Sequence, residues 1–342
     1  MENNTNLLDK NVSIFPIPMN NDSEYQRLLE TAEPLEEKEL KEVENEYGFT
    51  YRQGIGEILY ALVTCRMDIS YALIKLSQYS VKPARIHFEA VAQLYRYLYA
   101  TREDGIYYWR NKPRLDLEDH AFPKCKFDPM IEKDSKNPLI QIRPEKLEGL
   151  VDSDFAGDRQ HRKSVTGVTL KLAGGAIIGK TRFQEIIAQS STEAEFIAAA
   201  DAGKMILYVR SILEQVGICQ EEATVLYEDN QGALLMAQAG QPTKKTRHVD
   251  IKHFSIQQWT EMDIIALNYI KTTFNSSDAM TKALGRTLFY RHMDYIMGRK
   301  IPEYVMYVLQ KCDKDKFLEI STVTKNTPHT QACDALSKSE GG

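Results

Sequence analysis

Residues 51–110 carry apolar side chains at steps of three and four positions, the spacing of one face of an α-helix. Proline lacks a backbone N–H, so Pro83 is expected to separate two of the helices. The pattern predicts a mainly helical region over 51–110. It runs through Ile55, Ile58, Leu59, Leu62 and Val63, then Tyr71, Leu73, Ile74 and Leu76, then Val91, Leu94, Tyr95 and Leu98.

Six aromatic residues of this region allow two interpretations. Exposed rings could stack on nucleic-acid bases, but the rims of a helical core are the interpretation we favour. The residues are Tyr95, Tyr97, Tyr99, Tyr107, Tyr108 and Trp109.

From residue 149 the alternation typical of strands replaces the helical period. Predicted strands lie at Leu150–Phe155, at Val168–Leu172 with a turn at Gly174-Gly175 into Ala176–Ile178, near Thr181–Ile187, at Val225–Glu228 and at Ile264–Ile270. Ser190-Ser191-Thr192-Glu193 has the form of a capping box and predicts a helix that ends at Val216, before Gly217. Further helices are predicted at Gly232–Gln238, at Val249–Thr260 and from Asp278 to Leu284.

This order of three strands, a helix, a strand, helices, a strand and a helix predicts an α/β fold, with a sheet of mixed direction flanked by helices. The predicted division is a loop-rich, acidic lead-in at 1–50, the helical region at 51–110, a proline-punctuated linker at 111–148, the α/β domain at 149–298 and a partly disordered tail at 299–342. Within the lead-in, the acidic stretch from Glu30 to Glu46 is expected to be a solvated loop or an exposed helix face.

The composition excludes several classes of protein. The chain has 342 residues, a net charge of −5 and no apolar run that approaches a membrane span. Residues 1–20 lack the features of a signal peptide. The five cysteines have no metal-finger spacing, so we expect reduced thiols in an intracellular protein rather than a zinc site. A polyanionic partner would have to bind to local basic patches.

Four carboxylates of the α/β region each stand at the edge of a predicted element. Asp152 follows the apolar pair Leu150-Val151, Glu195 lies in the first turn of a helix, Asp229 ends a strand and Asp278 opens a helix. Acids at strand ends and helix starts can converge, and convergent carboxylates bind hard cations such as Mg²⁺. Two such ions can catalyse phosphodiester hydrolysis.

Each of these acids taken singly is weak evidence. Asp278 could be an ordinary helix N-cap. Asp154 shares a strand face with Asp152, and only one of the two need reach a metal. Glu193 and Glu195 are about 200° apart around a helix, so they cannot share a role.

Several motifs together resemble the ribonuclease H domain of Ty1/copia-type retrotransposons. They are Val151–Asp158, Arg162–Gly167, Ser190–Ala198, Tyr227–Gln231, Arg247–Ile251 and Ser277–Lys282, in the family's order. Upstream, Tyr51–Tyr60 and Thr64–Ile69 resemble the segment that follows the polymerase core, with Met67 where that pattern usually has proline. The residues His87, Tyr97, Leu98, Thr101 and Gly105 fit the same segment.

The resemblance implies an RNase H-like fold preceded by a thumb-like polymerase connection. It assigns Asp152, Glu195, Asp229 and Asp278 as catalytic acids that bind two Mg²⁺ ions, for which Mn²⁺ can substitute. The implied activity is endonucleolytic cleavage of the RNA strand of an RNA–DNA hybrid during reverse transcription. The implied partners are the hybrid and other polyprotein parts such as polymerase and integrase, with no membrane, in a cytoplasmic particle or the nucleus.

Other members of the wider family have a loop histidine before the last acid. Residues 271–277 contain none, so either another group does its work or turnover is slower. A DDE-type recombinase shares the fold, but its acid pattern fits this chain less well.

Two basic clusters could bind the phosphates of a hybrid or could be ordinary solvated loops. The first includes Arg162 and Lys163, and the second contains Lys244, Lys245, Arg247 and His248. His248 is expected to contact phosphate or to be structural rather than to bind a metal. Two alternatives to the enzyme stay open: a catalytically silent retroelement remnant, and a nucleic-acid-binding module that supports a separate polymerase.

Overall fold

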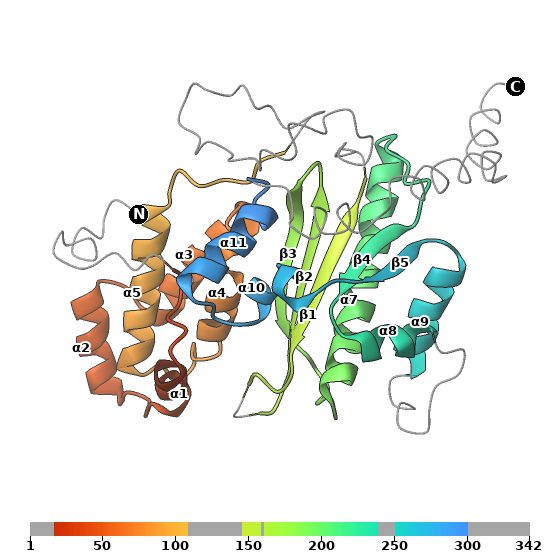
Figure 1. Ribbon diagram of the computed structural model, residues 1–342. Coiled ribbons are helices and arrows are strands. Elements are labelled where there is room, and N and C mark those ends of the chain that lie inside the picture. The colour runs from red at the N-terminus through yellow and green to blue at the C-terminus, as the bar shows by residue number, and fades with distance from the viewer. Residues whose placement is uncertain (1–16, 109–145, 159–160, 239–249, 300–342) are drawn as a thin grey trace, which may run out of the picture. The chain divides into compact units, whose positions relative to one another are not determined.

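The structure, a computed structural model, describes residues 17–108, 146–158, 161–238 and 250–299 (Figure 1). All of these residues fall within one compact unit, 1–301, and the second unit, 302–342, lies outside them. The predicted linker at 111–148 and the predicted tail therefore lie almost entirely outside the described residues. No helix in the described ranges is long and apolar enough to cross a membrane.

A five-stranded sheet of mixed direction forms the centre of the α/β region, as predicted. Its order is β3-β2-β1-β4-β5, in which β1, β2 and β3 are antiparallel neighbours while β4 and β5 run parallel to β1. The strands are β1 (Glu148–Asp154), β2 (Val165–Leu172), β3 (Gly175–Phe183), β4 (Thr224–Glu228) and β5 (Ile265–Tyr269). Because β1 and β4 are parallel neighbours, their carboxyl ends lie at the same edge of the sheet.

One expected strand was wrong. The chain has no separate strand near Thr181–Ile187, because residues 175–183 form the single strand β3. Ala173 and Gly174 both have positive φ, so the chain reverses tightly and the full length of β3 pairs with β2. The strand ends before Gln184, whose amide nitrogen instead donates to Thr166 Oγ1 and to the Ala194 carbonyl.

The long helix α7 (Ser191–Gln215) covers one face of the sheet, and both of its predicted ends are confirmed. The Ser190 hydroxyl accepts a hydrogen bond from the Glu193 N–H at 3.2 Å, and the Glu193 carboxylate accepts one from the Gln189 N–H at 2.9 Å. Gly217 has a φ of +80°, which suits the residue that follows a helix. Helices α8 (Gln231–Gln238) and α9 (Asp250–Glu261) lie beside α7 (Figure 1).

The other face of the sheet packs against the predicted helical region. This region contains α3 (Tyr51–Thr64), α4 (Ser70–Ser77) and α5 (Arg85–Ala100), and it is joined by two later helices, α10 (Asp278–Thr281) and α11 (Arg286–Ile296). Gly167 of β2 has no side chain, which leaves room for Met280 and Thr281 of α10. The Ser70 hydroxyl donates to Thr181 Oγ1 at 2.8 Å, and Thr181 donates to the Met280 carbonyl at 2.6 Å. The helical region and the sheet are therefore in direct contact through α4, α10 and β3.

The lead-in is more helical than expected. Residues 17–50 contain α1 (Ser23–Thr31) and α2 (Glu37–Tyr47), although we expected a loop-rich segment. Each helix is anchored by one fully buried apolar residue, Leu29 in α1 and Val43 in α2. Most of the acidic side chains of α2 face solvent, so this stretch is an exposed helix face rather than a loop.

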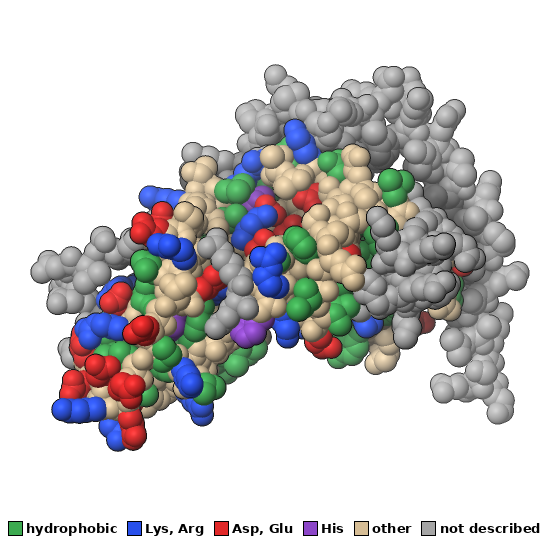
Figure 2. Space-filling model, turned by 90° about the horizontal axis from the view of Figure 1, so that it is seen from below, with side chains coloured by type: hydrophobic (Ala, Val, Ile, Leu, Met, Phe, Trp, Pro, Cys, Tyr) green, Lys and Arg blue, Asp and Glu red, His purple; other side chains and the backbone are tan. Residues whose placement is uncertain are grey.

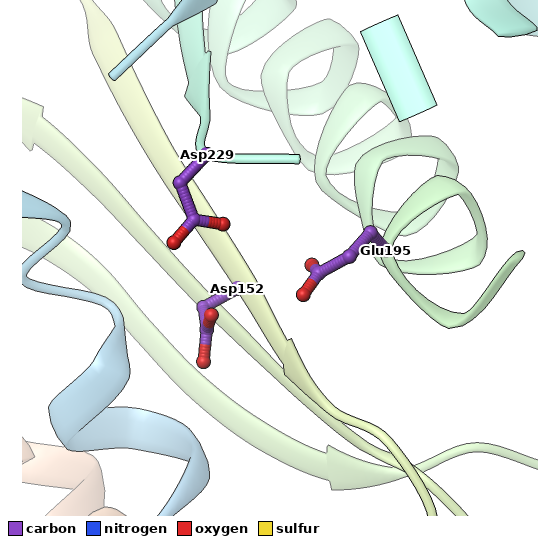
Figure 3. A group of neighbouring side chains, drawn as sticks. All are labelled: Asp152, Glu195 and Asp229. Atoms are coloured by element: carbon purple, nitrogen blue, oxygen red, sulfur yellow. The ribbon is translucent and has the colours of Figure 1, made fainter. Parts of the chain in front are cut away.

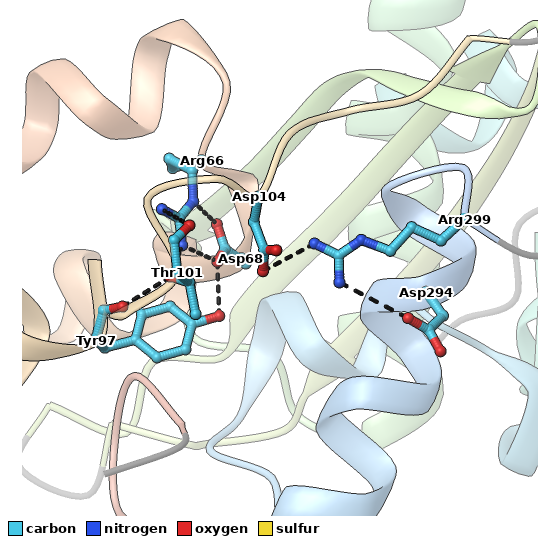
Figure 4. Close-up of polar contacts among 7 residues, drawn as sticks. All are labelled: Arg66, Asp68, Tyr97, Thr101, Asp104, Asp294 and Arg299. Carbon is cyan, nitrogen blue, oxygen red and sulfur yellow. Dashed lines mark hydrogen bonds and ion pairs between the residues drawn. The ribbon is translucent and has the colours of Figure 1, made fainter. Parts of the chain in front are cut away.

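The segment with the unusual Met67 is held by a buried ion pair (Figure 4). Arg66 makes two hydrogen bonds to Asp68, at 3.0 and 2.7 Å, and also donates to the Thr101 carbonyl at 3.1 Å. The Tyr97 hydroxyl donates to Asp68 at 2.7 Å. Met67 itself packs over Gly179 of β3, so this departure from the family pattern fills space between α4 and the sheet.

Of the six aromatic residues, Tyr95 and Tyr97 are buried, which agrees with the interpretation as a helical core. Tyr99 and Tyr108 are about half exposed, at 47% and 54%. Tyr107 is partly exposed as well, and Trp109 lies outside the described residues.

Candidate metal centre

Three of the four predicted acids meet at the edge of the sheet where β1 and β4 end. Asp152 comes from β1, Glu195 from the start of α7, and Asp229 from the residue after β4 (Figure 3). One carboxylate oxygen from each lies within 4.8 Å of the other two. Asp152 and Glu195 are only 3% and 6% exposed, and Asp229 is half-buried. The cluster is therefore largely shielded from water.

The fourth predicted acid, Asp278, lies beside this group on α10. Its carboxylate pairs with Lys282 Nζ at 2.9 Å, one helical turn further on. Ser277 occupies the N-cap position of α10, so Asp278 is the first residue of the helix rather than its cap. In the same turn the Thr281 hydroxyl donates to Asp152 Oδ2. Helix α10 thus contacts the cluster through both Thr281 and Asp278.

Burial and mutual repulsion raise the pKa of every acid in the cluster. Burial is the largest cause for Asp152, followed by the charge of Asp278, and together they raise its pKa to about 6. Burial raises the pKa of Glu195 well above its ordinary value, with a further contribution from neighbouring carboxylates. The pKa values of Asp229 and Asp278 are also raised, mainly by burial.

This donor set fits a hard divalent cation. It consists of carboxylate oxygens, the ligands that Mg²⁺ prefers. Glu195 Oε2 is buried and has no hydrogen-bond partner among the described residues. A cation bound between the acids would relieve the repulsion that raises their pKa values. Asp152, Glu195 and Asp229 are residues that could hold such an ion.

A fifth acid, Glu228, directly precedes Asp229, and the sequence analysis did not single it out. It is the last residue of β4 and is 1% exposed. Leu226 and Glu228 are two residues apart and point to the same face of the strand, and Leu226 packs in the core under α7. This two-residue alternation along β4 is present in the sequence, but strand alternation is normally used to locate buried apolar residues and not buried acids.

Of the predicted basic residues, the structure describes Arg162 and Lys163. Arg162 is exposed and Lys163 is partly exposed. Both belong to the connection from the end of β1 to the start of β2, at the same edge of the sheet as the acids. Lys244, Lys245, Arg247 and His248 lie outside the described residues. Two acids close in sequence to the predicted catalytic ones lie elsewhere. Glu193 accepts a hydrogen bond at the start of α7, and Asp154 lines a cavity.

That cavity has a volume of about 320 Å³ and opens next to Lys282. Asp154 and Phe155 line one side of it, while Gln26 of α1 and Tyr71 of α4 line the other. The helical region therefore contributes to the surface beside the acids.

Curated relatives match most of this chain. The "Retrovirus-related Pol polyprotein from transposon TNT 1-94" of Nicotiana tabacum is 29% identical over 239 residues, 70% of this chain. The corresponding polyprotein from transposon RE1 of Arabidopsis thaliana is 27% identical over 252 residues, and the Ty1-LR3 Gag-Pol polyprotein of Saccharomyces cerevisiae is 22% identical over 250. The chain is a distant homologue of Ty1/copia Pol polyproteins.

The chain spans only a small part of these relatives: 16% of the tobacco polyprotein, 15% of the Arabidopsis one and 12% of the yeast one. No protein-family model matches it.

Among solved structures, LC11-RNase H1, isolated from compost by a metagenomic approach, is similar over 40% of this chain and 93% of its own, with 15% identity and a TM-score of 0.32. A crystal structure of the same protein in complex with an RNA/DNA hybrid gives a TM-score of 0.30 with 12% identity, over 40% of this chain and 94% of its own. The five-stranded mixed sheet of this chain, in the order β3-β2-β1-β4-β5, is RNase H-like.

Proposed function

We propose that this protein cuts the RNA strand of RNA–DNA hybrids by two-metal catalysis, as part of retrotransposon reverse transcription. The observation that carries the proposal is the convergence of Asp152, Glu195 and Asp229 within 4.8 Å at the edge of an RNase H-like sheet. Homology to retrovirus-related Pol polyproteins supports a role in that context.

Each acid has a role that follows from its position. Asp152 and Asp229 come from neighbouring parallel strands and would hold both ions, with Mn²⁺ able to replace Mg²⁺. Glu195 approaches from α7 and would bind the second ion and orient the attacking water, while Asp278 completes the site from α10. When bound, the ions activate water and stabilise the leaving oxygen of the phosphodiester.

Lys282 balances the negative charge of the site. It pairs with Asp278 and is attracted to Asp152, and these carboxylates raise the pKa of its ammonium group. A protonated lysine beside the acids would also attract the substrate phosphate. Lys282 lies four residues after Asp278, so its long side chain could swing away and leave the Asp278 carboxylate to a metal ion while the backbone stays in place.

The hybrid would bind along the edge of the sheet that carries the acids. Figure 2 shows Lys and Arg side chains gathered near the centre of one face, next to Asp and Glu side chains. Arg162 and Lys163 lie in a loop at this edge, and we propose phosphate contacts for them and for Lys244, Lys245, Arg247 and His248. Specificity would come from hybrid shape and from the 2′-hydroxyl groups of the RNA strand.

We also propose roles for the helical region and for other parts of the polyprotein. The helical region at 51–110 would be a polymerase connection that helps to hold template and primer. Polymerase and integrase parts of the same polyprotein would be partners, in a cytoplasmic particle or the nucleus. Residues 271–277, which include the short 3₁₀ helix Thr272–Phe274, contain no histidine, so product release would depend on another group.

A cleavage assay tests the proposal. Purified protein is incubated with Mg²⁺ and an end-labelled hybrid, with a DNA duplex of the same sequence and an Asp152→Asn variant purified in the same way as controls. We expect internal cuts in the RNA strand only, and none with the variant or with EDTA. Hybrid binding without cleavage would favour the binding module, and the absence of both would favour the silent remnant.

A further inference from the structure

Glu228 is held at the end of β4 by a contact that shapes the loop after it. Its Oε1 accepts a hydrogen bond from the Asn230 N–H at 3.0 Å. Asn230 Oδ1 in turn accepts from the Ala233 N–H at 3.1 Å, in the first turn of α8. These two bonds fix the tight connection between β4 and α8, and Asp229 lies in the middle of that connection. Glu228 therefore determines where the Asp229 carboxylate points.

The second oxygen of Glu228 has no such partner. Glu228 Oε2 is buried and accepts no hydrogen bond from any residue that the structure describes, and the same is true of Glu195 Oε2. The two residues come from facing elements, because the face of β4 that carries Glu228 packs under α7. Of the neighbouring charges, Glu228 has the largest effect on the pKa of Glu195.

Two buried carboxylate oxygens without partners are costly unless a cation or a shared proton lies between them. The cost of an unpaired buried charge is several kcal/mol on general grounds. Glu195 belongs to the group formed with Asp152 and Asp229, which already has the composition of a divalent-cation site, and Glu228 directly precedes Asp229 in the chain.

We propose that Glu228 is a fifth carboxylate of the metal centre: one oxygen positions Asp229, and the other binds a divalent cation together with Glu195. The inference rests on the proposed function in that the ion is the one used for hybrid cleavage. Metal binding can nevertheless be measured without any cleavage, so the two can fail separately.

The test uses Mn²⁺ as the probe, with bound and free ion distinguished by electron paramagnetic resonance in a titration of the full chain. Glu228→Gln keeps the size of the side chain and an oxygen that can accept from Asn230, but it removes the charge. Glu228→Ala removes both. Glu221→Gln is the matched control, since it makes the same change at an exposed residue just before β4.

We expect Glu228→Gln to weaken Mn²⁺ binding at one site by about 10- to 100-fold, the range seen when groups that support a metal ligand are lost. Glu228→Ala should weaken it at least as much, and Glu221→Gln should bind like wild type. Thermal melting in EDTA verifies folding: Glu228→Gln should melt at or above the wild-type temperature, because it removes repulsion.

Unchanged Mn²⁺ binding by a folded Glu228→Gln protein would overturn the inference and would mean that the two glutamates share a proton instead. Weakening by Glu228→Ala alone would also overturn it, since Glu228 would then only position Asp229. If wild type binds Mn²⁺ through Glu228 but does not cut hybrids, the proposed function fails and this inference stands. If wild type cuts hybrids and Glu228→Gln binds Mn²⁺ normally, this inference fails and the proposed function stands.

Discussion

Replacing Asp152 by asparagine should stabilise the metal-free protein while it abolishes metal binding. The amide keeps the size of the side chain and an oxygen that can accept from the Thr281 hydroxyl, but it removes one buried negative charge. Asp152 is 3% exposed and is surrounded by other carboxylates, so ionising it in the folded protein is unfavourable.

The size of this effect follows from the pKa of Asp152, which is raised to about 6. An aspartate in an unfolded chain has a pKa of about 3.9, so the shift of roughly two units is worth about 3 kcal/mol. The folded-state pKa is the higher one. Ionisation of Asp152 therefore costs the folded protein no stability at low pH. The cost grows as the pH rises from about 4 and reaches its full size above about 6.

The measurement is thermal melting in EDTA between pH 4 and pH 8, for wild type and Asp152→Asn. At pH 7.5 the variant should be more stable by up to about 3 kcal/mol, or roughly 6 °C in Tm at about 2 °C per kcal/mol for a large domain. The difference should shrink toward pH 4. Adding Mg²⁺ should stabilise only wild type. A variant that melts at or below wild type without metal, or that Mg²⁺ still stabilises, would refute the reasoning.

Three further predictions concern the substrate and the limits of the activity. Glu195→Gln should abolish hybrid cleavage, whereas Glu193→Gln should retain it and lose only about 0.5–1 kcal/mol of stability through the helix start; the opposite result would mean that the functional glutamate of α7 is misassigned. Replacing Lys244, Lys245 and Arg247 by alanine should flatten the salt dependence of hybrid binding by up to about 0.9 per lost phosphate contact, and an unchanged slope would make them a solvated loop. Primer extension with Mg²⁺ and deoxynucleotides should give no product, since no adjacent Asp-Asp pair occurs in the sequence; template-dependent extension would reveal a missed polymerase site.

The elements around the site were predictable because their signals are local. Alternation of apolar residues marked four of the five strands, and the Ser190 cap with Gly217 marked both ends of α7. Parallel strand ends and a helix start then place Asp152, Glu195 and Asp229 at one edge of the sheet. Periodicity and capping act over a few residues, and that is the range over which a single sequence is informative.

Long-range packing could not be predicted in the same way. The last predicted helix runs from Asp278 to Leu284, whereas that helix ends at Thr281 and a separate helix, α11, follows. A stripe such as Phe289, Met293 and Ile296 shows one buried face but not which core receives it. In the structure these residues pack with the helices before the sheet. The lead-in helices were missed for a related reason, since each has one fully buried apolar anchor among many charges, too few to define a period.

Glu228 shows a different limit. A glutamate at an inward-facing position of a strand conflicts with the expectation that such positions are apolar, so it is easily dismissed as a register error. Buried carboxylates are unfavourable unless something compensates them. When the alternation of a strand places one inside, beside another candidate acid, a bound cation is a physical reason for it.

The helical region and the sheet are also coupled at the site itself. Ser70 of α4 bonds to Thr181 of β3, which bonds to the backbone of Met280 in α10. The next residue of α10, Thr281, donates to Asp152, and the same short helix begins with Asp278, whose carboxylate pairs with Lys282 just after the helix ends. A helix of four residues has little stability of its own, so its position depends on what packs against it. The segment that resembles a polymerase connection therefore contacts the short helix of the fourth acid through Thr181 of β3, and this contact couples the helical region to the edge of the sheet that carries the acids.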